Sequence, residues 1–527
     1  MTDLRSMSPR TRWSIAAAAA IAWAVARSTT GRDVFNPGGW DSFAEFWASV
    51  ADPELAIEFL RTTADATSTT ASFAVLGTVV SVVVGLLAGP LVSERVWESG
   101  DRRRSWTWVR RVVRGIVRLA FVVPRAVHEV IGALLLIQIF GFDPWVAILA
   151  IGVQFGAVTT KVYGELIDDA DPRAFRALRA AGASRIAALS YGIAPAVRRD
   201  VVSYGFYRLE CAVRSAAVLG IIGAGGLGFQ LDLSFESLRY EEIWTLIIAL
   251  MILSGLADAW SSKVRHDATS RAQRRSWLLV VASIPIAAWH VDLRPNALWS
   301  ARSRRLAGDL IGDLLPPRLG PGGWGELASA TIDTLAMSML ATVIAVVGGI
   351  VAATVAARPW RRPVPFRSRA AGGLARLILL LFRAVPAPVW AFLVVLVMFP
   401  GIWPGAVALG VYNLGVLGRL FAEVFEDHDD RARRQLATTG ASSVQQLTYA
   451  VLPTTAPRLA ALALYRWEVI TRETVVVGVV GAGGIGRLIQ EHLVARDFAA
   501  VLGAIGGLVV LTALIDVTSA RLRRSLR

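Results

Sequence analysis

Apolar residues along this chain gather in twelve runs, separated by short charged stretches. Most runs are near the length of about 20 residues that a helix needs to cross the hydrocarbon layer of a membrane. They predict an all-α, polytopic membrane protein with about twelve transmembrane helices. The runs lie at 13–27, 70–92, 114–140, 144–164, 205–230, 240–260, 277–290, 332–356, 374–399, 403–422, 462–486 and 497–518.

The runs at 13–27 and 277–290 are the weakest of the twelve, because their apolar cores are short. A signal peptide is an alternative interpretation of the first run, and a buried helix of a soluble domain is an alternative for either. Each run opens one half of the chain at the same relative place. This position favours a membrane span over a cleaved leader.

Composition agrees with a membrane protein. The 527 residues are 54% hydrophobic and only 18% charged, and the mean hydropathy is positive at +0.52. The net charge of +15 comes almost wholly from arginine, since Lys161 and Lys263 are the only lysines. The arginines stand between apolar runs instead of on one polar domain, which argues against a nucleic-acid-binding face.

The placement of these arginines predicts how the chain is oriented. Basic loops at 93–113, 261–276 and 357–373, and the basic C-terminal tail, all fall on one side if there are twelve crossings. By the positive-inside rule that side is the cytoplasm, and both termini lie there. The segment 292–331 falls on the other side although it holds five arginines, and we expect it to lie on the membrane surface or in the periplasm.

The chain contains an internal repeat with a fixed offset of 258 residues. The stretch RSAAVLGIIGAGGLG at 214–228 returns as RETVVVGVVGAGGIG at 472–486. The same offset, without a gap, also pairs Arg125 with Arg383, Glu165 with Glu423, Gly182 with Gly440, Pro195 with Pro453 and Asp258 with Asp516. The sequence therefore predicts two tandem six-helix units: 1–260, a basic cytoplasmic linker at 261–276, and 277–527.

The repeated glycine cluster has the spacing of a dinucleotide-binding fingerprint. That fingerprint requires a preceding strand and a soluble sheet, whereas both clusters end a predicted membrane helix. Glycines there can break the helix beside a cavity and free backbone amides to face an anion, or they can serve helix packing alone. The candidate pathway glycines are Gly223, Gly225, Gly226, Gly481, Gly483 and Gly484.

A second repeated element lies in a predicted cytoplasmic loop. In the first copy Asp171 and Pro172 can begin a short helix, Gly182 can end it, and Ser184 can cap the next. The second copy keeps this pattern with Asp429, Gly440 and Ser442. A short charged helix pair between two spans is suited to docking a partner protein, with a merely solvated loop as the alternative.

These segments resemble the EAA loop of importer-type ABC transporter permeases, whose short helix sits in a groove of the ATPase subunit. More narrowly, YRLECAVRSAAVLGIIGAGGLG and YRWEVITRETVVVGVVGAGGIG resemble the permease of phosphonate importers. Family members are usually single six-span chains that dimerise, so this chain resembles two permease copies fused in one. The resemblance assigns ATPase coupling to Glu165, Asp171, Gly182, Pro195, Glu423, Asp429, Gly440 and Pro453.

The resemblance implies several partners. They are two copies of an ABC ATPase, which bind ATP and magnesium, a periplasmic or lipid-anchored solute-binding protein, membrane lipid and a small oxyanion. The chain itself has no GxxxxGK[ST] phosphate loop, a single cysteine, Cys211, and five histidines without metal-ligand spacing. We expect no catalytic residues, metal or cofactor within this chain.

Ionisable residues inside the spans are candidates for the substrate pathway, because burying a charge in a membrane is costly. Glu210 and Arg214 are four residues apart, as are Glu468 and Arg472, and each pair can shield its charges on one helix face. The candidate pathway residues are Arg214 and Arg472 first, with their partners Glu210 and Glu468, and then Arg125 and Arg383. The alternative is that they only hold helices together.

The two copies differ at positions that bear on the pathway. Ser215 is replaced by Glu473, and His128 stands where the other copy has Pro386, the residue that the family usually places there. These differences make strict two-fold equivalence of the pathway doubtful.

The resemblance implies a permease that opens alternately to each side of the membrane, driven by ATP hydrolysis in its partner. Its cargo is then a phosphonate or a related oxyanion, such as phosphate or phosphite. Two alternatives stay open. One is a permease for another small solute, such as methionine, and the other is an ATPase-independent channel or a membrane-embedded enzyme.

Overall fold

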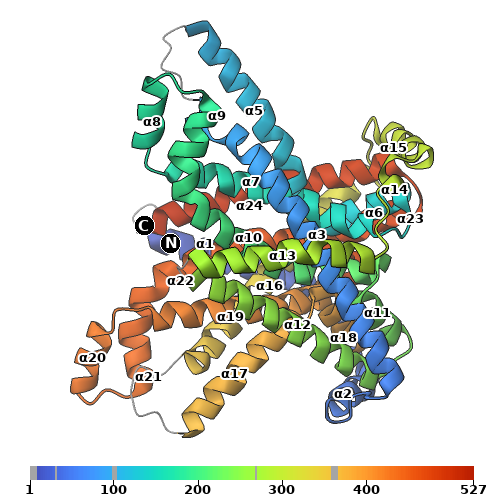
Figure 1. The fold of residues 1–527 in the computed structure, drawn as a ribbon. Helices are drawn as coiled ribbons and strands as arrows, with labels where there is room; N and C mark the ends of the chain where they lie inside the picture. Colours follow the sequence, from blue (N-terminus) through green and yellow to red (C-terminus); the bar gives the residue numbers. More distant parts are fainter. Residues whose placement is uncertain (1–8, 30–32, 98–103, 267–269, 358–365, 527) are drawn as a thin grey trace. The chain divides into compact units, whose positions relative to one another are not determined.

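The computed structural model describes residues 9–29, 33–97, 104–266, 270–357 and 366–526. It is all-helical, as predicted (Figure 1). Among the described residues the β structure is one isolated bridge, between Phe35 and Met398. A soluble sheet beside either glycine cluster is therefore absent from the described part of the chain, and the dinucleotide-binding interpretation is excluded.

The helices form two compact units, which we describe separately. The central unit consists of Ser49–Gly312, and the terminal unit consists of Met1–Ala48 together with Asp313–Arg527. Each unit contains one glycine cluster and one candidate coupling segment.

The central unit holds most of the first sequence copy. Its helices are η2 (Ser49–Ala51), α3 (Ile57–Val92), α4 (Glu94–Trp97), α5 (Arg104–Ala126), α6 (Glu129–Phe140), α7 (Trp145–Asp169), α8 (Arg173–Ala180), α9 (Arg185–Ala188), η3 (Leu189–Ile193), α10 (Ala194–Leu219), η4 (Gly220–Ala224), α11 (Leu227–Glu236), α12 (Tyr240–His266), α13 (Ser270–His290) and α14 (Asn296–Trp299). The helix α15 (Ala301–Leu314) spans the boundary between the units.

The terminal unit holds most of the second copy. Its helices are α1 (Pro9–Thr29), η1 (Pro37–Gly39), α2 (Trp40–Ala48), α16 (Gly323–Ala356), α17 (Phe366–Ala384), α18 (Ala387–Val397), α19 (Ile402–Glu426), α20 (Arg431–Thr438), α21 (Ser443–Gln446), η5 (Leu447–Val451), α22 (Leu452–Val477), η6 (Gly478–Ala482), α23 (Gly484–Val494) and α24 (Phe498–Leu526).

The compact units do not follow the boundaries of the sequence repeat. The first helix of the first copy, α1, packs against α16 in the terminal unit, and the first helix of the second copy, α13, packs against α3 in the central unit. Each sequence copy therefore gives its opening helix to the unit built mainly from the other copy. The boundaries 1–260, 261–276 and 277–527 stay a prediction about the repeat, and residues 267–269 of the linker lie outside the described residues.

Six described helices are long and apolar enough to cross a membrane, and up to ten spans result if each of four bent helix pairs counts as one. The six are α3, α7, α12, α16, α19 and α24. The expected spans at 13–27 and 277–290 form α1 and α13, which are not among them. The count of twelve is therefore not confirmed.

Two expected spans bend by about a right angle. The run at 114–140 forms α5 and α6, which meet at 92°, and the run at 374–399 forms α17 and α18, which meet at 95°. The break in the first has a physical cause at His128, whose extended backbone and side chain cap α6. At the second break Pro386 has an extended backbone at the N-cap of α18. Because proline lacks an amide hydrogen, it favours a helix start over a helix interior.

Small residues bring the central spans of each unit together. In the central unit a Cβ at Gly77 of α3 would lie 2.8 Å from the Ile151 side chain, and a Cβ at Gly152 of α7 would lie 2.5 Å from that of Val80. In the terminal unit Gly410 of α19 meets Ile344 of α16 in the same way, at 2.7 Å. Such close contact replaces the hydrophobic effect as the main source of helix association in a membrane.

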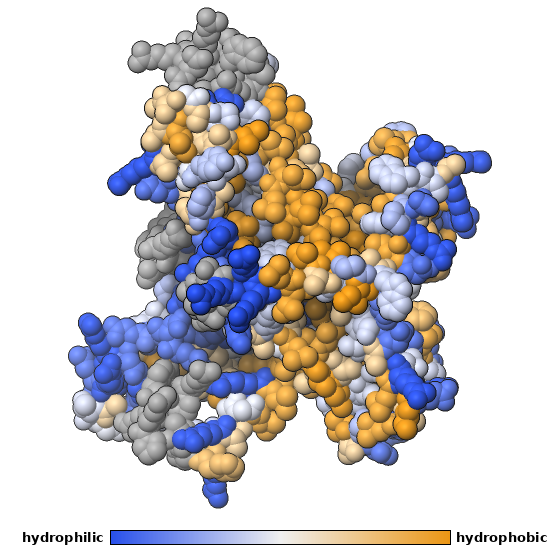
Figure 2. All heavy atoms as spheres, viewed as in Figure 1, coloured by the Kyte–Doolittle hydropathy of each residue, from blue (hydrophilic) through white to orange (hydrophobic). Residues whose placement is uncertain are grey.

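Exposed apolar side chains cover the outer faces of several spans. Leu87 of α3 and Leu119 of α5 are 72% and 64% exposed. In Figure 2 the surface over these two helices is largely hydrophobic, whereas hydrophilic side chains gather near α20 and α15. An apolar surface of this kind is suited to contact with lipid tails.

Candidate functional site

Each glycine cluster interrupts a helix within its unit. In the central unit η4 has non-helical backbone angles at Ile222 and Gly223, and α11 continues after a bend of 53°. In the terminal unit η6 has non-helical angles at Val480 and Gly481, and α23 continues after a bend of 59°. The predicted break of the helix is confirmed in both copies.

The glycine residues at the breaks adopt backbone angles that other residues rarely adopt. The φ angles of Gly223, Gly225 and Gly226 are +96°, +96° and +78°, and those of Gly481, Gly483 and Gly484 are +99°, +90° and +70°. A neighbouring helix caps the chain just after each break. The Leu227 amide donates to Thr70 Oγ1 at 2.9 Å, and the Ile485 amide donates to Thr334 Oγ1 at 2.9 Å.

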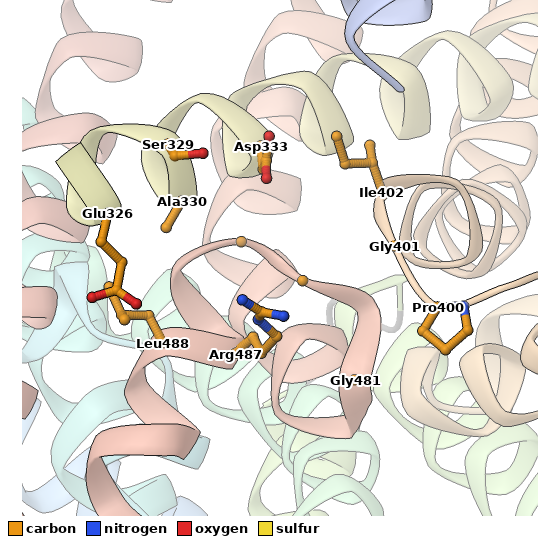
Figure 3. A pocket seen from close by; sticks show the side chains of 12 residues that line it. Glu326, Ser329, Ala330, Asp333, Pro400, Gly401, Ile402, Gly481, Arg487 and Leu488 are labelled. Atoms are coloured by element: carbon orange, nitrogen blue, oxygen red, sulfur yellow. The ribbon is translucent and has the colours of Figure 1, made fainter. Parts of the chain in front are cut away.

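A cavity of about 450 Å³ adjoins the break in the terminal unit. Figure 3 shows Asp333 and Glu326 of α16 on one side of it and Arg487 of α23 reaching in from another. A Cβ at Gly481 or Gly483 would meet nothing within 4 Å. In the central unit Phe142 packs against the corresponding break, since a Cβ at Gly223 would lie 2.6 Å from its ring. The two breaks therefore have different surroundings.

Of the two ion pairs predicted within α10 and α22, only the pair in the central unit forms. In the central unit Glu210 lies 3.6 Å from Arg214 and 3.6 Å from Arg265. In the terminal unit Glu468 pairs with Arg523 at 2.5 Å instead of with Arg472. The expected pair between Glu468 and Arg472 is wrong, because α24 supplies a closer partner to each.

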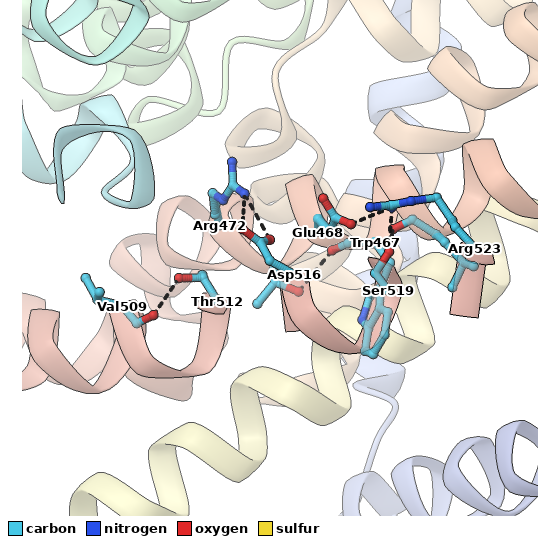
Figure 4. Close-up of polar contacts among 10 residues, drawn as sticks. Trp467, Glu468, Arg472, Val509, Thr512, Asp516, Ser519 and Arg523 are labelled. Carbon is cyan, nitrogen blue, oxygen red and sulfur yellow. Dashed lines mark hydrogen bonds and ion pairs between the residues drawn. The ribbon is translucent and has the colours of Figure 1, made fainter. Parts of the chain in front are cut away.

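Figure 4 shows this terminal-unit network along α22 and α24. Arg472 Nη2 lies 3.2 Å from Asp516 Oδ1, and Arg523 Nη1 also donates to Ser519 Oγ at 2.6 Å. Both Glu210 and Glu468 are 8% exposed, and each charge is compensated within its unit by an arginine of another helix, Arg265 of α12 and Arg523 of α24.

The second group of predicted arginines lies near the helix breaks at 126–129 and 384–387. Arg125 lines a cavity of about 270 Å³ together with Arg118, Lys161 and Glu165. Arg383 lies in the last turn of α17, where its backbone nitrogen would be 2.6 Å from a Cβ at Gly415. The structure therefore brings Arg125 and Glu165 to one cavity, although sequence analysis placed them in different functional groups.

The candidate coupling segments fold as helix, glycine turn and helix, as predicted. In the central unit α8 ends before Gly182, with a φ of +86°, and Ser184 Oγ accepts from the Ala187 amide at 3.1 Å to cap α9. In the terminal unit Gly440 has the same φ of +86°, and Ser442 forms a capping box with Gln445.

The acids that occur in both copies of these segments accept hydrogen bonds at the helix starts. Asp171 accepts from the Arg173 amide at 3.0 Å, and Asp429 accepts from the Arg431 amide at 3.1 Å. Pro195 and Pro453 stand in the first turns of α10 and α22, where the missing amide hydrogen is tolerated.

The two candidate coupling glutamates are both accessible. Glu165 lies 3.6 Å from Lys161 and Glu423 lies 3.1 Å from Arg419, each one helical turn earlier on the same helix. Their side chains are 58% and 53% exposed. Exposed pairs of this kind contribute little to stability, so these carboxylates are available to a partner.

Comparison with known proteins gives the same organisation. The model of the family described as "Binding-protein-dependent transport system inner membrane component" matches residues 58–261 and again residues 345–527. The chain belongs to this family. The match in two segments confirms the predicted tandem duplication, and this permease is an inner-membrane, multi-pass component of an ABC importer that is not itself catalytic. The family implies a partner ATPase and a solute-binding protein.

Two curated relatives are similar over most of their own length. The phosphite transport system permease protein PtxC of Stutzerimonas stutzeri is 34% identical over 247 residues, which are 47% of this chain and 86% of the relative. The phosphate-import permease protein PhnE of Mycolicibacterium smegmatis is 27% identical over 405 residues, which are 75% of this chain and 74% of the relative.

A solved structure of the MetNI methionine ABC transporter is a more distant match to this permease. It is 19% identical and covers 40% of this chain and 100% of the solved chain, with a TM-score of 0.36.

Sequence analysis missed two charged side chains that the structure places inside the units. Arg208 of α10 and Arg466 of α22 occupy equivalent positions in the two copies, in YRLE and YRWE. The fixed offset of 258 residues was the signal that could have found them, because an arginine retained in both copies of a membrane span is unusual.

Proposed function

We propose that this permease carries a phosphonate, or a related oxyanion such as phosphate or phosphite, across the cytoplasmic membrane by alternating access coupled to a separate ATPase. The observation that carries the proposal is the similarity of both copies to transporter subunits named for phosphite and phosphate. Arginine side chains within the bent spans, including Arg214 and Arg472 with their carboxylate partners, have N–H donors suited to an oxyanion.

The exposed surface of the helix pairs supports the proposed coupling roles. Ile186 and Tyr191 follow the first glycine turn and are 77% and 79% exposed. Val444 and Tyr449, at the same offset in the second copy, are 71% and 74% exposed. Large apolar side chains repeated on two exposed segments are suited to burial in a protein partner. We assign each segment to one ATPase copy, with Glu165 and Glu423 at its edge.

The orientation and the pathway belong to the same proposal. We place both chain termini and both coupling segments in the cytoplasm, where ATP is available, and the solute-binding protein on the opposite side. The pathway contains the two glycine breaks and the arginines at 125, 214, 383 and 472.

The test is uptake of radiolabelled phosphate into vesicles that contain the complete complex of permease, ATPase and binding protein. We expect ATP-dependent uptake that unlabelled methylphosphonate inhibits and methionine does not. The double variant Glu165→Gln/Glu423→Gln is expected to lose uptake. The matched control is Asp309→Asn, which removes an exposed carboxylate of α15 and is expected to transport normally.

Other outcomes decide between the alternatives. Methionine uptake without phosphate uptake would keep an ABC importer and discard the oxyanion. Phosphate uptake without ATP, or full uptake by the double glutamate variant, would contradict the coupling mechanism and favour a channel.

A further inference from the structure

Arg208 and Arg466 stand at equivalent positions of the two sequence copies. Each lies near the middle of its long helix, α10 or α22, between the coupling segment and the glycine break. A guanidinium at such a position remains charged and must face a partner or a polar cavity instead of lipid. The partners of the two arginines are therefore informative.

In the terminal unit the charge of Arg466 is cancelled within the protein. Its Nη2 lies 2.9 Å from Glu473 Oε1, and both side chains are only 14% exposed. Asn413 completes the group, since its amide oxygen accepts from Arg466 Nε and its amide nitrogen donates to Glu473 at 2.9 Å. This is a closed, neutral network.

In the central unit the equivalent arginine has aromatic neighbours instead. The Arg208 guanidinium lies 5.0 Å from the ring centre of Phe155 and 4.9 Å from that of Tyr204, and its Nε donates to the Tyr204 hydroxyl at 2.9 Å. Among the described residues no carboxylate lies within 4.0 Å of it. Aromatic rings and a phenol hold a guanidinium in place without neutralising it.

The sequence difference between the copies explains this contrast. Ser215 stands where Glu473 stands in the other copy, and Phe155 stands where Asn413 stands. The carboxylate of this region in the central unit comes from Glu129 of α6, and it is engaged by Ser215 Oγ at 2.6 Å and His128 Nδ1 at 3.3 Å. Ser215 thus holds the acid in a different network from Arg208.

We infer that Arg208 is the group in this permease that binds the oxyanion during its passage, and that Arg466 has no such role. The inference rests on the proposed function and makes it more specific. A guanidinium offers several N–H donors to phosphate-type oxygens, and Arg208 carries no competing carboxylate. The first copy of the duplicated permease therefore provides the cation that binds the oxyanion. In the second copy Glu473 pairs with the equivalent arginine, Arg466.

The test transplants the arrangement of the terminal unit into the central unit. Glu129→Ala/Ser215→Glu gives the first copy the residues that the second copy has at these two positions, Ala387 and Glu473. The new glutamate has the same spacing from Arg208 as Glu473 has from Arg466, so it is expected to neutralise the arginine without removing it. Arg208→Gln and Arg208→Lys complete the series, and Arg466→Gln/Glu473→Gln is the matched control.

We expect ATP-driven phosphate uptake by the complete complex to fall about tenfold or more in Glu129→Ala/Ser215→Glu and in Arg208→Gln, the effect of losing one charge-assisted hydrogen bond. Arg208→Lys should keep part of the uptake, and the Arg466→Gln/Glu473→Gln control should stay within about twofold of the original chain. Yield of the assembled complex and its basal ATPase rate show that each variant is folded.

Two results overturn the inference. Normal uptake by Arg208→Gln would do so directly, as would an equal loss of uptake in the Arg466→Gln/Glu473→Gln control. If the transplanted variant does not assemble, the comparison of Arg208→Gln with Arg208→Lys decides instead. If the original chain transports no oxyanion, both the proposed cargo and the inference about Arg208 are wrong. If the original chain and Arg208→Gln both take up phosphate normally, the proposed cargo stands and only the inference about Arg208 is wrong.

Discussion

Arg27 of α1 forms an ion pair with Asp333 of α16 at 2.9 Å, although 306 residues separate them in the chain. A polar contact also joins the other exchanged helix to its unit, where His290 Nε2 of α13 lies 3.2 Å from Thr69 Oγ1 of α3. These contacts explain how the opening helix of each copy is held in the unit built from the other copy.

The exchange of opening helices can be tested by crosslinking. In a Cys211→Ala background, Arg27→Cys/Asp333→Cys is expected to form an intramolecular crosslink with a short thiol-specific reagent, detected by mass spectrometry after digestion. The control is Arg27→Cys/Val347→Cys, which moves the second cysteine 14 residues along the same helix, about 21 Å away. Equal crosslinking of both pairs, or none of the first, would show that α1 does not pack as described.

The glycine turns of the coupling segments require their positive φ. Alanine at Gly182 or Gly440 would place a Cβ in a left-handed conformation that costs about 1–2 kcal/mol. We expect Gly182→Ala/Gly440→Ala to uncouple the permease, so that ATP-driven uptake falls while the ATPase subunits keep their own activity. Gly373→Ala is the control, because Gly373 lies inside α17 with open space where a Cβ would be. Normal uptake by the double variant would contradict a docking role for the turns.

The second coupling segment is expected to respond to pH through Asp430. A hydrogen bond from Arg433 lowers the pKa of the Asp430 carboxyl below its ordinary value of 3.8. A carboxyl whose pKa is lower in the folded protein stabilises α20 at all pH values above 3.8, and this contribution is lost as the pH falls through the lowered pKa.

Hydrogen exchange measures this effect. The protection factors of α20 amides should fall as the pH drops below about 3.8, whereas Arg433→Phe, which copies Phe175 of the first segment, should lose that dependence. The same pH dependence in Arg433→Phe would assign it to another group.

The buried ion pair between Glu468 and Arg523 predicts that a single substitution lowers the stability more than the double substitution does. Glu468 is 8% exposed, so Glu468→Gln leaves the Arg523 charge without its carboxylate and should lower the free energy of unfolding by about 3 kcal/mol. The double variant Glu468→Gln/Arg523→Gln should recover most of the loss, because no charge is then left unpaired. Thermal unfolding in nanodiscs checks both values, and additive losses would show that the two side chains do not interact.

The sequence by itself determined the class of the protein and the parts of its site that depend on local chemistry. The apolar runs are longer than the core of a soluble protein needs, so they predict membrane helices. The repeat at an offset of 258 residues predicts two copies of one unit. The helix breaks at Gly223 and Gly481 and the turns at Gly182 and Gly440 were predictable as well. Each depends on backbone freedom that glycine supplies within a few residues.

Only the tertiary structure decided which distant residues meet. The choice of Asp516 over Glu468 as the partner of Arg472, and of Arg523 as the partner of Glu468, depends on how α24 packs against α22. The association of α1 with α16 likewise depends on side chains of another helix, as do the contacts of Arg208 with Phe155 of α7 and of Arg466 with Asn413 of α19. Helical spacing specifies neighbours on one helix, whereas contacts between helices are set by packing that sequence spacing does not encode.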